Sequence, residues 1–230
     1  MAALVITTDG RKLPVGLWLG DSENRTVVTD LLADLQARGL SAERGLLAVI
    51  DGGKALATAV RKVFGEQALI ERCTLHKRRN VVGYLGKELA GRTDRRLAAA
   101  FNHPDPAAGL ARARSIATEL EADHPDAAAS LREGLADMFT VRRLGVDGRL
   151  ARSLTNTNCI ESMISVARTT MGNVKRWRDG QMKKRWMAAG VLEAERSFRR
   201  LKGCQAMPVL VAALRQATGV TPAKYDEEAA

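Results

Sequence analysis

The chain has 230 residues, of which 46% are hydrophobic and 27% charged, a balance typical of a folded globular protein rather than a disordered one. Its 36 Lys and Arg against 26 Asp and Glu give a formal net charge of +10, which favours a polyanionic partner such as nucleic acid. No apolar run approaches the roughly 20 residues that span a bilayer, and three scattered cysteines do not form a disulfide framework. We therefore expect neither a membrane protein nor a disulfide-rich secreted one.

The first elements predict a sheet with helices packed on it. Residues 3–7 and 12–19 are apolar runs joined by Thr8-Asp9-Gly10-Arg11, and Asp-Gly in such a position is a strong hairpin signal. A helix with apolar residues at helical spacing follows and ends near Gly39. The run Leu46–Ile50 then predicts a buried strand that ends at Asp51. After it we expect a helix over 54–64, a short strand over 68–70 and a helix over 75–90.

The remainder of the chain is predicted to be mostly helical. Residues 92–138 are rich in Ala and have prolines where helices would begin or break, whereas 139–150 reads as a loop or short extended stretch. Further helices are expected over 159–173, 180–201 and 207–216. This order predicts an α/β core whose first part is 1–90, an all-helical insertion over 91–140, a last core part over 141–218 and a flexible tail over 219–230.

Two acidic residues are candidate metal ligands. Asp51 follows a buried strand, at the edge of an α/β sheet where ligands usually bind. Glu161 lies just inside a predicted helix, and a cluster of such carboxylates could hold a divalent metal. Each has a purely structural alternative, since Asp51 could cap the helix beginning near Lys54 and Glu161 could interact with a helix dipole.

Cys73 and His76 form half of a zinc-ligand pattern. No second Cys/His pair lies at a suitable distance, because His103 and His124 stand alone beside prolines. A structural role at a strand-to-helix junction, or a thiol–imidazole pair near an active site, is therefore favoured over a zinc site.

Most of the excess positive charge lies late in the chain. Residues 168–202 contain 11 Lys or Arg and only three acidic residues. Trp177 and Trp186 are interpreted as core or groove-edge residues, with base stacking as the alternative. The run Lys77-Arg78-Arg79, earlier in the chain, could contact DNA or could instead form a solvated helix face. The candidate DNA-binding residues are Lys77, Arg78, Arg79, Lys175, Arg176, Lys183, Lys184 and Arg185.

Several linked motifs resemble the mutator-type transposases of bacterial insertion sequences, which are DDE-type enzymes. They run from Thr8-Asp9-Gly10 to Gly16-Leu17-Trp18-Leu19-Gly20-Asp21-Ser22-Glu23-Asn24, through Leu31-Leu32-Ala33-Asp34-Leu35 to Arg38-Gly39-Leu40 and Val49-Ile50-Asp51-Gly52-Gly53-Lys54-Ala55-Leu56. They continue with Arg72-Cys73-x-x-His76-Lys77-x-Arg79-Asn80-Val81 and Thr157-Asn158-x-x-Glu161-Ser162. The resemblance implies a ribonuclease-H-like fold with a helical insertion, and three acids that hold two Mg²⁺ (or Mn²⁺) ions for DNA strand cleavage and transfer.

Residue by residue, the resemblance makes Asp51 the second acid, Glu161 the third, and Cys73 and His76 the Cys-x-x-His element that supports the site. It also implies double-stranded DNA at transposon ends and target as partner, a homo-oligomer with itself or with an intact transposase, no membrane, and a cytoplasmic, nucleoid-associated location in bacteria.

The first acid is the one that this sequence does not match. In the family it lies on the strand before the hairpin, whereas Asp9 matches the turn and Asp21 and Asp30 lie beyond the second strand. We therefore expect the first strand of the sheet to be missing and the activity of this chain to be impaired. The alternatives are a non-catalytic DNA-binding transposase remnant and a metal-dependent nuclease unrelated to transposition, which the motif order does not favour.

Overall fold

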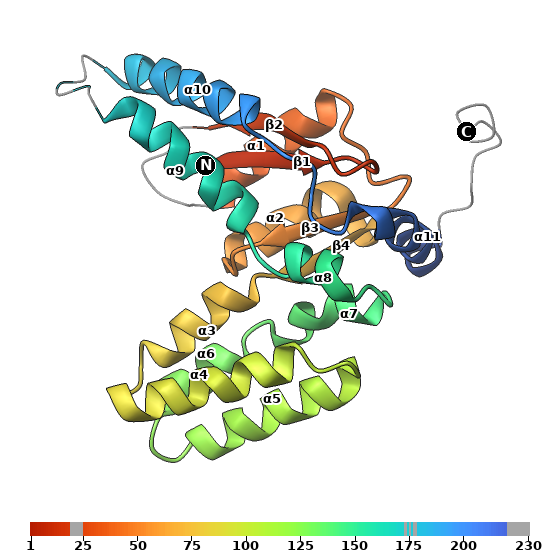
Figure 1. Ribbon diagram of the computed structural model, residues 1–230, viewed down its shortest axis with the longest axis vertical. Coiled ribbons are helices and arrows are strands. Elements are labelled where there is room, and N and C mark those ends of the chain that lie inside the picture. Colours follow the sequence, from red (N-terminus) through yellow and green to blue (C-terminus); the bar gives the residue numbers. More distant parts are fainter. Residues whose placement is uncertain (19–24, 173, 175, 177–178, 220–230) are drawn as a thin grey trace.

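A computed structural model describes residues 1–18, 25–172, 174, 176 and 179–219 of the chain, and the predicted tail beyond 219 lies outside this part (Figure 1). The strands are β1 (Ala2–Ile6), β2 (Lys12–Leu17), β3 (Leu46–Ile50) and β4 (Ala68–Arg72). The helices are α1 (Arg25–Ala37), α2 (Lys54–Phe64), α3 (Thr74–Val82), α4 (Lys87–Phe101), α5 (Pro106–Leu120), α6 (Pro125–Arg132), α7 (Thr140–Arg143), α8 (Gly148–Leu154), α9 (Asn158–Met171), α10 (Gly180–Arg196) and α11 (Met207–Thr218), with 3₁₀ turns η1 (Gly65–Gln67), η2 (Leu135–Phe139) and η3 (Cys204–Ala206).

The predicted hairpin is confirmed. Strands β1 and β2 pair antiparallel, with Ala2 opposite Leu17 and Ile6 opposite Lys12. Gly10 has φ 81°, a conformation that residues with a Cβ rarely adopt, and it closes the turn. A Cβ on Gly10 would come within 2.4 Å of the Cys204 Cβ, so the hairpin tip also packs closely on the segment before α11.

Strands β3 and β4 form a second, parallel sheet joined by α2. Leu46 pairs with Ala68 and Ile50 with Arg72, so both strands end at the same edge. Side chains alternate between the two faces of a strand. Leu46, Ala48 and Ile50 therefore pack in a cluster with residues of α2, while Leu47 packs on the other face with residues of α8 and α11.

The two sheets are not joined by a ladder among the described residues. Nevertheless, Ile6 of β1 packs in the same hydrophobic cluster as Leu47 of β3 and Leu69 of β4. The hairpin and the parallel pair therefore belong to one layer, and Figure 1 shows them one above the other. In the described part of the chain, β1 pairs only with β2 and β3 only with β4, which leaves one edge of each strand open.

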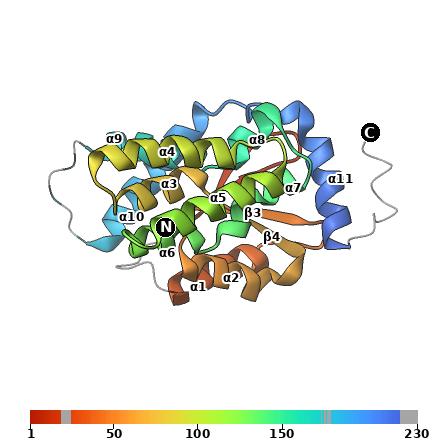
Figure 2. The same cartoon turned by 90° about the horizontal axis from the view of Figure 1, so that it is seen from below.

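A helical unit occupies the lower part of Figure 1 and Figure 2 views it from below. Its core extends from Val81 in α3 to Phe139 in η2, and includes Leu97, Phe101 and Leu131. This core begins ten residues earlier than the predicted insertion. The predicted helix over 75–90 is divided into α3 and α4, which are separated by a turn containing Gly83 and Gly86.

The prediction of a loop or extended stretch over 139–150 was wrong. This segment contains α7 and the start of α8, and short helices separated by glycines at positive φ do not show a clear helical period in sequence. Beyond it, α9 and α10 pack against each other through small residues: a Cβ on Gly190 would lie 2.8 Å from the Ala167 Cα. None of the helices in the described residues combines the length and hydrophobicity of a membrane span.

Candidate active site

Asp51 lies where β3 ends, and its backbone is held on both sides. The Cys73 amide donates to the Ile50 carbonyl at 2.7 Å, and Arg72 Nη1 donates to the Gly52 carbonyl at 3.0 Å. Gly52 itself has φ 113°, so the chain turns sharply just after Asp51. The N-cap of α2 is Gly53, two residues after Asp51, and the Asp51 carboxylate accepts a long hydrogen bond of 3.4 Å from the Gly53 amide.

Cys73 and His76 lie at the start of α3, directly beyond the end of β4. Cys73 is buried, and its Sγ lies 3.2 Å from His76 Nδ1. The Thr74 amide and hydroxyl both contact the Thr155 carbonyl at 3.0 Å, which holds the start of α3 against the segment that leads into α9. The predicted strand-to-helix junction and thiol–imidazole contact are therefore both present.

Glu161 projects from the first turn of α9 toward the same pair. Its Oε1 accepts a hydrogen bond of 2.8 Å from the Thr157 hydroxyl and lies 3.8 Å from His76 Nδ1. Its Oε2 lies 3.9 Å from an Arg79 guanidinium nitrogen. The carboxylate remains partly exposed, at 40% of its side-chain surface, and can therefore be reached from solvent.

Thr157 connects these groups and was not recognised as a site residue from the sequence. It is buried, and its Oγ1 lies 3.2 Å from His76 Nδ1 as well as 2.8 Å from Glu161. With Nδ1 protonated, the imidazole donates to the hydroxyl and the hydroxyl donates to the carboxylate. Its place four residues before Glu161, on the N-cap of α9, was the available signal.

Cys73, His76 and Glu161 therefore meet around Thr157, and Asp51 is joined to them only through the backbone of its neighbour Ile50. A continuous series of contacts leads from Ile50, beside Asp51, through Cys73 and Thr157 to Glu161. Carboxylate oxygens are the ligands that Mg²⁺ prefers. Their number is insufficient, however, because the described residues contain no group of three or more His, Cys, Asp or Glu arranged to hold a metal. The carboxylates are thus of the right chemical type for a divalent metal, but the described residues supply too few of them to hold one.

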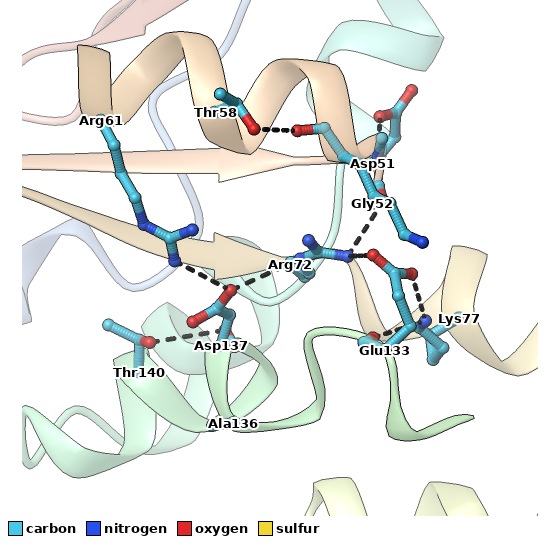
Figure 3. A network of polar contacts seen from close by, with 12 residues as sticks. Asp51, Gly52, Thr58, Arg61, Arg72, Lys77, Glu133, Ala136, Asp137 and Thr140 are labelled. Atoms are coloured by element: carbon cyan, nitrogen blue, oxygen red, sulfur yellow. Dashed lines mark hydrogen bonds and ion pairs between the residues drawn. The ribbon is translucent and has the colours of Figure 1, made fainter. Parts of the chain in front are cut away.

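Lys77 does not have the exposed position that a DNA contact requires. Its side chain is only 4% exposed, and its Nζ donates to the Ser130 carbonyl at 2.5 Å and to the Glu133 carbonyl and carboxylate at 2.8 and 3.1 Å (Figure 3). Burial lowers the pKa of Lys77, although the hydrogen bond to Glu133 opposes this. Lys77 binds groups inside the protein because it lies on the face of α3 that packs against α6.

The other predicted cations differ in their surroundings. Arg78 forms a two-pronged pair with Asp94, at 2.8 and 2.5 Å, whereas Arg79 is exposed beside Glu161. Lys184 Nζ lies 5.8 Å from the centre of the Trp18 ring. Trp186 is 40% exposed, so of the two predicted positions it does not have the core one. Lys175 and Trp177 lie outside the described residues, and the remaining exposed candidates are Arg176, Lys183, Lys184 and Arg185.

Comparisons with known proteins agree with the order of the motifs. Residues 1–199 match the family model described as "Transposase, Mutator family". The transposase for insertion sequence element IST2 of Acidithiobacillus ferrooxidans is 26% identical over 163 residues, which are 71% of this chain and 54% of that protein. The chain thus spans about half the length of this curated relative.

Proposed function

Because the chain belongs to the mutator family of transposases, we propose that it forms the catalytic part of a DDE-type enzyme that cleaves and transfers DNA strands when an insertion element moves. One observation carries this proposal: a series of contacts through Cys73 and Thr157 links the Ile50 carbonyl, next to Asp51, with Glu161, which lies 110 residues after Asp51 in sequence. The layer of β1 to β4 with helices on both faces supports a ribonuclease-H-like core, with the helical unit as its insertion.

Asp51 and Glu161 would hold Mg²⁺ or Mn²⁺, which when bound supplies Lewis-acid stabilisation of the charge that develops on a phosphate. The chain's own residues orient these carboxylates. Thr157 and Arg79 contact the two oxygens of Glu161, and the hydrogen bonds at Ile50 and Gly52 hold the backbone around Asp51. Cys73 and His76 support Glu161 through Thr157.

A third carboxylate is required to complete the donor set. The resemblance puts the family's first acid on the strand that precedes β1 in the chain, and we place that strand between β1 and β3 in the sheet. The open edges of these two strands support that position, because a strand between them would join the two sheets into one. On this proposal the 230-residue polypeptide by itself has impaired strand cleavage.

Duplex DNA, at transposon ends and target, is the proposed partner. The exposed cations Arg79, Arg176, Lys183, Lys184 and Arg185 supply phosphate contacts without reading bases. A homo-oligomer, or assembly with an intact transposase, is part of the same proposal. The alternative function is DNA binding without catalysis, and the exposed basic residues would serve it equally well.

Plasmid nicking in Mn²⁺ tests the catalytic proposal. The assay compares the 230-residue polypeptide with a version extended by the in-frame codons upstream in its gene, each as wild type, Asp51→Asn and Glu161→Gln. Asp30→Asn, an exposed carboxylate on α1, is the matched control.

We expect strong nicking only from the extended protein, and a loss of at least about 100-fold in both site variants but not in the control. Nicking by the extended protein that survives both site substitutions would refute the catalytic role of Asp51 and Glu161. Salt-dependent DNA binding without nicking by either version would favour the non-catalytic alternative. Nicking by the 230-residue polypeptide that depends on both acids would refute its impairment.

A further inference from the structure

The backbone that carries Asp51 is fixed by two consecutive residues at the end of the neighbouring strand β4. Arg72 is the last residue of β4 and Cys73 follows it, and they bind the carbonyls of Gly52 and Ile50 respectively. Asp51 lies between these two carbonyls. The contact from Cys73 continues the parallel sheet by one step, whereas the contact from Arg72 is made by a side chain.

The Arg72 guanidinium reaches Gly52 because the helical unit holds it there. Its side chain is 6% exposed, and Nη1 uses its two protons on the Gly52 carbonyl and on Glu133 Oε1, the latter at 2.6 Å. Nε lies 3.5 Å from Asp137. Figure 3 shows the guanidinium between these three groups, of which Glu133 directly follows α6 and Asp137 lies in η2.

Glu133 is the shared partner of two buried cations. One oxygen accepts from Arg72 and the other from Lys77. Burial by itself would raise the pKa of Glu133, but the hydrogen bonds from Arg72 and Lys77 outweigh it and hold the pKa below its usual value. Next to it, Gly134 at φ 62° packs directly on the guanidinium, since a Cβ there would lie 2.3 Å from Arg72 Cζ.

We propose that Arg72 is a positioning residue for Asp51, and that Glu133 fixes Arg72 from the helical unit, so that the insertion is needed to orient a carboxylate of the site. This inference rests on the proposed function only for the role of Asp51. The arrangement of donors is independent of that role: a charged side chain, shielded from water, holds the carbonyl next to the acidic residue.

The discriminating variant is the double substitution Arg72→Met/Glu133→Gln. It removes one positive and one negative charge together, so the formal charge of the network is unchanged while the donor to Gly52 is lost. Lys77 keeps the main-chain carbonyls of residues 130 and 133 as acceptors. Arg72→Lys restores a positive donor with a shorter reach. Arg96→Met is the matched control, because Arg96 forms a two-pronged pair with Glu119 in the same helical unit but at its surface.

The first readout is amide hydrogen exchange of residues 51–54 under native conditions. We expect exchange about tenfold faster in the double variant, an intermediate rate in Arg72→Lys, and no change in Arg96→Met. Exchange at the wild-type rate in the double variant would overturn the proposal, because Arg72 would then serve only as a counter-charge.

The second readout is the Mn²⁺ affinity of the protein extended by its upstream codons, because the 230-residue polypeptide has too few donors. It is measured for the same variants and, separately, for Asp51→Asn. An orienting contact of this kind changes metal affinity by about tenfold or more, so we expect the double variant to bind Mn²⁺ at least that much more weakly. Wild-type affinity in the double variant would overturn the positioning role. Unchanged affinity in Asp51→Asn would instead refute the proposed function, and the amide exchange would still test the contact from Arg72 independently.

Discussion

Glu71 is a buried carboxyl on β4 that the proposed chemistry does not use. It has no exposed surface, its Oε2 accepts from the Val141 amide at 2.8 Å, and its Oε1 has no hydrogen-bond partner among the described residues. Burial raises its pKa to about 8. At neutral pH the group is therefore mostly protonated in the folded chain and ionised in the unfolded one.

This difference predicts a stability that depends on pH. Between pH 4.5 and 8 the folded state binds the proton that the unfolded state releases, so the contribution of Glu71 to stability falls as pH rises through this range. Glu71→Gln should remove this pH dependence, which amounts to roughly 3–4 kcal/mol between pH 5 and 8 at ~1.4 kcal/mol per pKa unit. Urea unfolding at pH 5 and 8 measures it, with the exposed Glu66→Gln as control. An identical pH dependence in wild type and Glu71→Gln would contradict the assignment.

Thr157 gives a second prediction at the scale of a single residue. Because its hydroxyl donates to Glu161, Thr157→Val should weaken Mn²⁺ binding by about tenfold, whereas Thr157→Ser should keep near wild-type affinity. A Mn²⁺ titration of each variant, made in the protein extended by its upstream codons, checks this. Thr169→Val, which removes an exposed hydroxyl later in α9, is the control. Equal affinities for the Val and Ser variants would show that Thr157 does not orient Glu161.

At the scale of elements, the turn between α6 and η2 depends on one glycine. Gly134→Ala combines an unfavourable positive φ with a collision against the Arg72 guanidinium, so we expect a loss of about 2–4 kcal/mol in the free energy of unfolding. Gly148→Ala is the control, because Gly148 has φ 59° but no atom within 4 Å of an added Cβ. Its expected loss is about 1 kcal/mol, measured by urea unfolding. Equal losses of unfolding free energy in Gly134→Ala and Gly148→Ala would mean that the Arg72 side chain moves aside at little cost.

At the scale of the whole molecule, the exposed cations of α10 predict DNA binding that depends on salt. Replacing Lys183, Lys184 and Arg185 by Gln should weaken binding to a duplex of arbitrary sequence, and lower the slope of log affinity against log salt by roughly 2–3. The control replaces Lys87, Arg92 and Arg95 of α4, which Figure 1 places at the opposite end of the molecule. Fluorescence anisotropy at several salt concentrations measures both. A slope equal to that of the control variant would place the DNA elsewhere.

The sequence by itself predicted the local elements and the family. Alternating and helical apolar patterns, with Asp-Gly and Gly signals, predicted the hairpin, β3, α2, β4 and the two long helices α9 and α10. Most of the predicted ends lie within a few residues of the observed ones. Short-range patterns suffice there because backbone geometry and turn chemistry act over a few residues. The motifs around Asp51, Cys73, His76 and Glu161 likewise identified the mutator family, which the comparisons confirm.

Only the tertiary structure decided what the cations and hydroxyls do. Lys77 and Arg79 are two residues apart, yet one is buried on Glu133 and the other is exposed beside Glu161. Thr157 contacts His76, and Arg72 contacts Glu133, across more than 50 residues of sequence. The burial of a charge and the partners of a hydroxyl depend on which distant element packs against them, and a linear pattern contains no such information. The open edges of β1 and β3 could not be predicted from the sequence either, because strand pairing depends on contacts between segments and not on the pattern within one segment.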